Sequence, residues 1–150
     1  MAPTHPLAPT EVAADFAPRL RLATMRLARL LRQHGDPGVS QSLISVLATV
    51  ARCGPVTLGR LAELEAVQPP SMTRIVAKLE ELGLVARTVD EADRRVARVR
   101  LTAAAQSLLA EVRIRRNEVL ASRLAALDAD ERAALEAALP ALERLAGVQP

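Results

Sequence analysis

The segment VQPPSMTRIVAKLEELGLV, residues 67–85, contains one complete helix followed by the start of a strand. Proline suits the first turn of a helix, and a glycine such as Gly83 readily adopts the left-handed conformation that ends one. Apolar residues at helical spacing predict one buried face, formed by Met72, Ile75, Val76, Leu79 and Leu82. The polar side chains of the first three turns are Ser71, Thr73, Arg74 and Lys78. A helix that is buried on one side is therefore expected to carry a polar surface on the other.

Short elements are predicted on both sides of this helix. Thr57 can cap a small helix that runs through about Leu64, and a connection at 65–68 leads to the helix at 69–81. Downstream, the segments LVAR (84–87) and ARVRL (97–101) predict two paired strands. Apolar residues alternate with arginine in the second segment, which is the period of a sheet with one wet face. This order of two short helices and a basic hairpin is typical of a winged helix-turn-helix.

Two longer helices are predicted before this central unit. Apolar residues at helical spacing predict a helix over 11–34, with Thr10 as its cap. The sequence HGDPG at 34–38 ends it, and a second helix is expected from about Ser40 to Cys53, where Gly54 and Pro55 stop it.

Two further helices are predicted after the hairpin, at about 103–126 and 129–146. Asp128 and Glu131 have the spacing of a capping box at the start of the second one. Pro140 is expected to kink or divide that helix, because proline removes a backbone donor and crowds the preceding turn.

The composition fits one helical domain. Half of the 150 residues are apolar, and with a single Phe and no Trp or Tyr the core must be aliphatic. The net charge is +3, and of the 20 basic residues only Lys78 is a lysine. One cysteine allows no disulfide within the chain, and Cys53 is expected to be a buried structural thiol. The absence of a signal-like or membrane-spanning segment predicts a cytoplasmic protein with no membrane partner.

The polar face of helix 69–81 suggests a DNA-reading surface. Such a helix buries one side in its own domain and presents Gln68, Ser71, Thr73, Arg74 and Lys78 to the major groove of double-stranded DNA. Its N-terminal amides are expected to be free to bind a phosphate. Arginine at the hairpin tip can enter a minor groove. The alternatives are an ordinary solvated helix and a hairpin charged for solubility.

The terminal helices suggest a homodimer, because their apolar stripes exceed what the central core can cover. We expect 11–34 and 103–146 to interleave with a second copy. A twofold dimer sets its two DNA-reading helices about 34 Å apart, which predicts a pseudo-palindromic operator. An intramolecular helix bundle is the alternative.

With these elements in place, the sequence resembles the multiple-antibiotic-resistance regulator (MarR) family of bacterial transcription factors, from about residue 12 to 146. The segment DEADRRVARVRLT (90–102) is similar to the family's D-x-R wing signature, with Asp93 and Arg95 on the signature positions and Leu101 and Thr102 at the start of the next helix. The resemblance implies that Arg95, beside Arg94, reads a minor groove and that Asp93 orients a nearby arginine.

The same resemblance covers helix 69–81. It assigns Pro69, Ser71, Met72, Thr73, Arg74 and Lys78 to the DNA-facing side or the N-terminal end. Gln68 stands where the family often has a better cap such as Ser, so the first turn is expected to depend on the prolines for its geometry.

The resemblance further implies a repressor that is released by a small aromatic or anionic ligand bound between the dimerisation helices and the winged domain. Polar groups that could line such a cleft are Arg26, Arg29, His34 and Arg52, although each is also an ordinary surface residue. We expect no cofactor and no metal, because one Cys and two His are too few for a typical transition-metal site. No catalytic triad spacing or phosphate-binding glycine loop supports an enzyme.

The fold expected from these elements is mainly α, a winged helix-turn-helix with a small β-hairpin wing and dimerisation helices at both ends. Residues 1–10 are expected to form a disordered tail, 11–39 and 102–150 the dimerisation helices, and 40–101 the DNA-binding domain. The alternative function on the same fold is a dimeric ligand-binding or protein-interaction module without specific DNA binding.

Overall fold

The computed structural model of the chain describes residues 9–34, 38–89 and 97–147, with side chains from residue 15 onward. The predicted fold class is confirmed, since most of the described residues are helical and the strands form one small antiparallel sheet. The elements in chain order are α1 (Pro9–Gln33), α2 (Gln41–Cys53), β1 (Val56–Thr57), α3 (Leu58–Leu64), α4 (Pro69–Glu81), β2 (Val85–Val89), β3 (Ala97–Leu101), α5 (Ala103–Ala125) and α6 (Ala129–Leu145).

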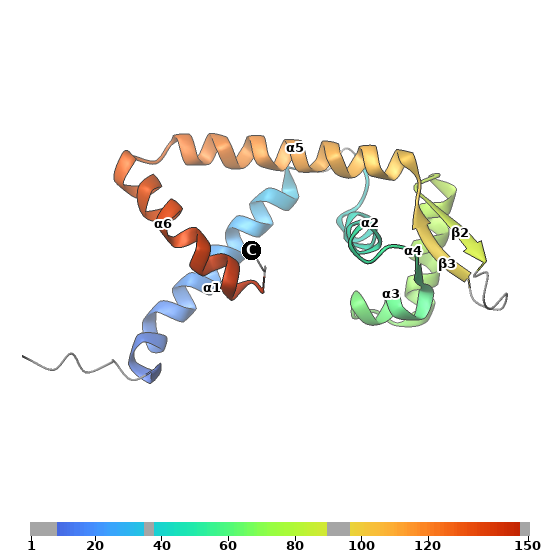
Figure 1. The fold of residues 1–150 in the computed structure, drawn as a ribbon, viewed down its shortest axis with the longest axis horizontal. Coiled ribbons are helices and arrows are strands. Elements are labelled where there is room, and N and C mark those ends of the chain that lie inside the picture. The colour runs from blue at the N-terminus through green and yellow to red at the C-terminus, as the bar shows by residue number, and fades with distance from the viewer. Residues whose placement is uncertain (1–8, 35–37, 90–96, 148–150) are drawn as a thin grey trace, which may run out of the picture.

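The long helix α5 organises the molecule (Figure 1). Helices α2, α3 and α4 and the hairpin of β2 and β3 lie beneath one end of α5, and α1 and α6 lie beneath the other. Helix α5 packs against both α1 and α2. The chain is therefore divided into two parts. The winged unit is compact and consists of α2, α3, α4 and the strands β1, β2 and β3, and the long helices α1, α5 and α6 form an open arrangement.

The sheet has the strand order β1-β3-β2, and both pairings are antiparallel. The predicted hairpin is confirmed, with Val85 opposite Leu101 and Val89 opposite Ala97. Strand β1 was not predicted, because two residues are too few to show a strand period. It adds Val56 opposite Val99, and both side chains are buried in the core.

The main hydrophobic cluster lies in the winged unit and the start of α5. Its buried members are Val46, Leu47, Val50, Val56, Leu61, Ala62, Met72, Val76, Leu79, Leu84, Val85, Val99 and Ala105. Helix α6 contributes no buried residue. On α1, Phe16 is 59% exposed and Met25 is 55% exposed. The apolar stripes of the terminal helices are thus left uncovered by the single chain.

Most helix ends follow their predicted signals. The side chain of Thr57 caps α3, and Asp128 and Glu131 form the complete capping box of α6. Gly54 and Gly83 have the positive φ angles of 74° and 68° that end α2 and α4.

Three details of the helices differ from the prediction. Helix α1 begins at Pro9, so Thr10 lies inside it rather than in front of it. Helix α6 runs undivided through Pro140. Since Glu136 is exposed, its carbonyl, which loses the backbone donor at Pro140, can bind water instead. Leu82 was expected to be buried but is 45% exposed, because α4 ends there and the chain turns away.

Candidate nucleic-acid interface

Helix α4 has one face in the core and one face in solvent, as its sequence pattern predicts. Met72, Val76 and Leu79 are completely buried. The exposed side chains of its first three turns are Ser71, Thr73, Arg74 and Lys78. The family resemblance places Met72 on the DNA-facing side or at the N-terminal end, among the DNA-binding residues, and for Met72 this assignment is wrong. Its thioether packs in the domain core, so it supports the helix and has no access to a ligand surface.

The first turn of α4 depends on its two prolines. Gln68 is the N-cap residue in an extended conformation, and its side chain makes no capping hydrogen bond. Pro69 and Pro70 have no N–H, and the amides of Ser71 and Met72 both donate to the carbonyl of Gln68, at 2.9 and 3.1 Å. Residues 69–72 therefore offer no free amide to a phosphate, contrary to the expectation for the start of this helix.

The exposed polar groups of α4 differ in how strongly they are already engaged. The Thr73 hydroxyl donates to the carbonyl of Pro69 at 3.0 Å, which leaves its oxygen free to accept another bond. The Lys78 ammonium pairs with Glu81 at 3.0 Å on the solvent side, where such pairs contribute little stability. Arg74 makes no hydrogen bond or ion pair with any of the described residues. Its guanidinium is thus available to donate to a ligand.

The end of α4 is held by directional bonds to the wing and to α5. The amide of Leu84 donates to the carbonyl of Leu79, and the amide of Gly83 donates to the backbone carbonyl of Glu80, both at 2.9 Å. This is the Schellman pattern. The Arg87 guanidinium on β2 pairs with Glu80 at 3.1 Å. The Thr102 hydroxyl donates to the carbonyl of Gly83 at 2.7 Å. The position of the helix is therefore linked to that of the wing and of α5.

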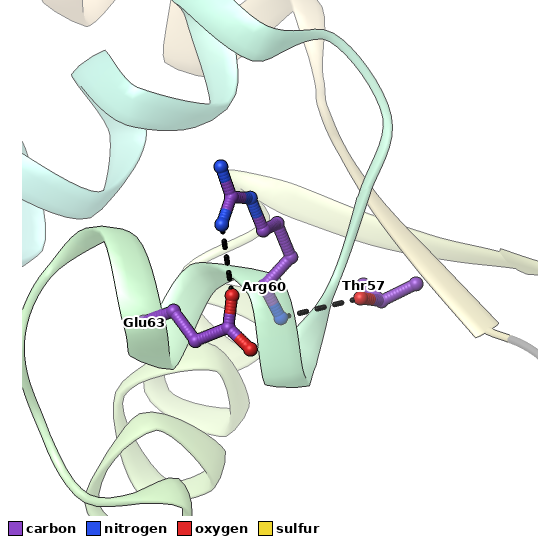
Figure 2. A network of polar contacts seen from close by, with 3 residues as sticks. All are labelled: Thr57, Arg60 and Glu63. Carbon is purple, nitrogen blue, oxygen red and sulfur yellow. Dashed lines mark hydrogen bonds and ion pairs between the residues drawn. The ribbon is translucent and has the colours of Figure 1, made fainter.

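Helix α3 begins beside β1 and carries a cation that the sequence pattern did not single out (Figure 2). The Thr57 hydroxyl accepts a hydrogen bond from the Arg60 amide at 3.3 Å, and the Arg60 guanidinium pairs with Glu63 at 2.8 Å. Both charged side chains are more than half exposed. In helix-turn-helix proteins the first helix crosses the DNA backbone, so Arg60 lies on an element suited to a phosphate contact. Its i,i+3 spacing to Glu63 was the available signal, but that spacing is equally common on ordinary surface helices.

The wing itself is described only at its base. Arg100 is exposed, Arg98 is partly buried, and Val99 between them is buried, as the alternation predicts. The predicted wing residues Asp93, Arg94 and Arg95 lie outside the described residues.

The four residues expected to line a ligand cleft do not meet at one place. Arg52 lies on a surface hollow of about 540 Å³ between α2, β3 and α5, opposite Arg113. Arg26 and Arg29 lie with Arg32 on a separate hollow of about 560 Å³ along α1. The His34 ring contacts the carbonyl of Leu30 at 2.9 Å, as a group that closes the end of α1. Of these two hollows, the one beside Arg52 lies between the winged unit and the long helix α5.

Cys53 was expected to be buried, and this prediction is wrong. It is an exposed thiol in the last turn of α2, where the chain turns away at Gly54 and leaves no element to cover it. Within the described part of the chain, no cluster of His, Cys, Asp and Glu could hold a metal ion. None of the helices in the described segments has the length and apolar character that a membrane crossing needs.

Two short helices joined by a tight turn, the second with a polar exposed face, followed by an antiparallel hairpin, define a winged helix-turn-helix protein. The model of the MarR family matches residues 39–97. An uncharacterised HTH-type transcriptional regulator of Mycobacterium bovis is 40% identical over 138 residues, which is 91% of this chain and 96% of the relative. The chain belongs to the MarR family of transcriptional regulators.

Two further comparisons agree with this assignment. The crystal structure of a transcriptional regulator protein from Pseudomonas aeruginosa superposes with a TM-score of 0.80 at 32% identity, over 93% of this chain and 99% of the other. The HTH-type transcriptional repressor MdtR of Bacillus subtilis is 32% identical over 102 residues, which is 68% of this chain and 66% of the repressor.

Proposed function

We propose that this regulator is a homodimeric repressor that binds a pseudo-palindromic operator through α4. The observation that carries the proposal is the division of α4 into a face that is completely buried at Met72, Val76 and Leu79 and an exposed face that carries Arg74. A helix held this firmly in its domain can present side chains to base edges with a fixed register. The base-reading set is Gln68, Pro69, Ser71, Thr73, Arg74 and Lys78.

The uncovered apolar residues of the terminal helices support a dimer. Helix α6 exposes Leu135, Leu139 and Leu145, and α1 exposes Phe16 and Met25. Apolar stripes of this kind on soluble chains are normally covered by a partner. A second copy would bury them and hold the two α4 helices about 34 Å apart, one turn of the duplex. Residues 11–39 and 102–150 would then act as dimerisation helices around the DNA-binding unit 40–101.

Repression is proposed because MdtR, which is similar over two thirds of this chain, is a transcriptional repressor. The wing is proposed to contribute Arg94 and Arg95 to the minor groove, with Asp93 orienting a nearby arginine, on the strength of the wing signature in the sequence. Substituting Arg95 by Ala should then weaken operator binding by about 1–3 kcal/mol. A regulator of this kind acts in the cytoplasm and needs neither a cofactor nor catalysis.

A small aromatic or anionic ligand is proposed to release the DNA. The hollow between α2, β3 and α5 supports this, because Arg52 and Arg113 place two cations beside the apolar side chains of Leu101 and Leu109. A ligand there would contact both the winged unit and a dimerisation helix. It releases DNA only if it favours a dimer with the wrong spacing of the two α4 helices.

The test begins with selection of a duplex from a randomised pool by the wild-type chain, followed by fluorescence anisotropy. A specific regulator binds the selected duplex far more tightly than a scrambled duplex, and its affinity falls steeply with salt. Arg74→Ala should reduce the preference for the selected duplex, whereas the control Arg132→Ala, on exposed α6, should not. Equal affinity of the wild type for every duplex would instead favour the interaction module without specific DNA binding.

The dimer is tested separately by light scattering at micromolar concentration. The proposal requires a particle of twice the 16.0 kDa chain mass. A particle of the single-chain mass would exclude the homodimer.

A further inference from the structure

The turn between α3 and α4 has an unusual backbone for its sequence. Its amides close the end of α3 in a Schellman pattern. The amide of Val67 donates to the carbonyl of Ala62 at 3.0 Å, and the amide of Ala66 donates to the backbone carbonyl of Glu63 at 3.2 Å. This pattern needs a left-handed residue, usually glycine, and here it is Ala66 with φ of 52°. Among the described residues Ala66 is the one non-glycine residue with positive φ. Such strain persists only where neighbouring contacts hold the backbone in place.

The neighbouring contact is made by Glu65. Its carboxylate accepts a hydrogen bond from the Ser45 hydroxyl at 2.7 Å on one oxygen, and one from the Thr49 hydroxyl on the other. The two hydroxyls lie one turn apart on α2. Thr49 is the one buried polar residue in the described part of the chain, and Glu65 is its side-chain partner. Both carboxylate oxygens are therefore used to attach the turn to α2.

We propose that Glu65 is a positioning residue that fixes the direction of α4 by attaching the turn before it to α2. This inference rests on the proposed DNA-binding function. The core side chains of α3 and α4 hold these helices in the domain through apolar contacts, which have little directional preference. Two charge-assisted hydrogen bonds at the entrance to α4 add a restraint on the direction of the helix, because they depend on direction as well as distance. Since α2 packs against α5, the attachment also connects the turn to a helix proposed for dimerisation.

The neighbouring acid provides a matched control. Glu63 lies two residues earlier on α3, is more than half exposed, and pairs with Arg60 of its own helix. It has the same charge and nearly the same sequence position as Glu65, but makes no bond to α2. Loss of Glu63 therefore reports the effect of removing an acid from this region without removing the attachment.

The experiment compares Glu65→Ala, Thr49→Val and Glu63→Ala with the wild type in two measurements. In the first, anisotropy gives the affinity for the duplex selected by the wild type and for a scrambled duplex of the same composition. Glu65→Ala should lose at least tenfold in affinity for the selected duplex and less than twofold for the scrambled one. Thr49→Val should lose about threefold to tenfold for the selected duplex, and Glu63→Ala should retain the wild-type preference.

The second measurement needs no DNA. Hydrogen exchange at the amides of Ala66 and Val67 should become at least tenfold faster in Glu65→Ala and stay unchanged in Glu63→Ala. If Glu65→Ala does not fold, Thr49→Val decides both measurements, because valine has the shape of threonine and suits a buried site.

The outcomes separate the two proposals. A wild type that selects no duplex refutes the proposed function, and the exchange rates then decide alone whether Glu65 holds the turn. The positioning role would be overturned if Glu65→Ala lost equal affinity for both duplexes, or if exchange at Ala66 and Val67 were no faster in it than in the wild type. Thr49→Val is judged by the same two criteria if Glu65→Ala does not fold.

Discussion

Thr102 offers the sharpest test of how the winged unit is joined to α5. Its hydroxyl donates to the carbonyl of Gly83 at 2.7 Å and accepts from the amide of Ala105 at 3.3 Å. Its own amide donates to the carbonyl of Leu84 at 3.1 Å. One residue thus closes the end of α4 and caps the start of α5. Replacing it by valine keeps the shape and the backbone bond but removes both bonds of the hydroxyl.

The expected magnitude follows from these two bonds. Loss of an N-cap side chain costs about 0.5–2 kcal/mol, and loss of a second hydrogen bond to a carbonyl at a helix end costs about 0.5–1.5 kcal/mol. Thr102→Val should therefore lower the free energy of unfolding by about 1–3.5 kcal/mol. With a urea dependence of about 2 kcal/mol per molar, the midpoint should fall by roughly 1 M.

The assay is urea unfolding followed by circular dichroism, at one fixed protein concentration because the stability of the proposed dimer would depend on concentration. Thr102→Ser keeps the hydroxyl and should lie close to the wild type. Thr73→Val is the matched control, since its exposed hydroxyl bonds only within α4, and it should change stability by less than about 0.5 kcal/mol. If Thr102→Val and Thr73→Val have the same urea midpoint, the Thr102 hydroxyl does not stabilise the connection between α4 and α5.

Three other predictions address the turn, the terminal helices and the wing. Ala66→Gly relieves the left-handed strain and should raise the free energy of unfolding by up to about 1 kcal/mol, whereas Ala66→Val should lower it, both measured in urea. Leu139→Glu adds a charge to the exposed stripe of α6 and should produce single chains in light scattering, while Arg132→Ala should leave the dimer intact. Arg87→Met removes the ion pair between Arg87 and Glu80, whose two side chains are 37% and 32% exposed. It should lower the free energy of unfolding by less than about 1 kcal/mol in the same urea assay. A loss above about 2 kcal/mol would show that this pair is stronger than an ordinary surface pair.

The sequence was informative wherever a local signal repeats over several residues. The stripe of Met72, Val76 and Leu79 predicted both the existence of α4 and its buried face, because apolar residues that recur at helical spacing over three turns are typical of an amphipathic helix. The capping box at Asp128 and the glycines at 54 and 83 marked helix ends through backbone requirements that few other residues meet. Strand β1 gave no such signal, because it has only two residues.

The site was less predictable, for physical reasons that differ from residue to residue. Family position placed Met72 toward DNA, but its burial is decided by its own place in the helical period. The prolines of α4 suit a helix start, yet they also remove the amides that would bind a phosphate. The attachment of Glu65 joins residues 16 and 20 positions apart, and a partially buried acid has no periodic pattern in sequence. Contacts of this kind become visible only when α2 and the turn are placed together.

The directional bonds are concentrated at the two ends of α4. At its entrance Glu65 attaches the turn to α2, and at its exit Glu80 and Gly83 bond to Arg87 and Thr102. Between these points the helix is held by apolar side chains, whose contacts have little directional preference. Helices α2 and α5 also line the hollow beside Arg52. A shift of α2 against α5 would therefore act on both ends of α4. A ligand in that hollow needs no contact with α4 to change the spacing of the two helices in the proposed dimer, provided that it favours one arrangement of α2 and α5 over the other.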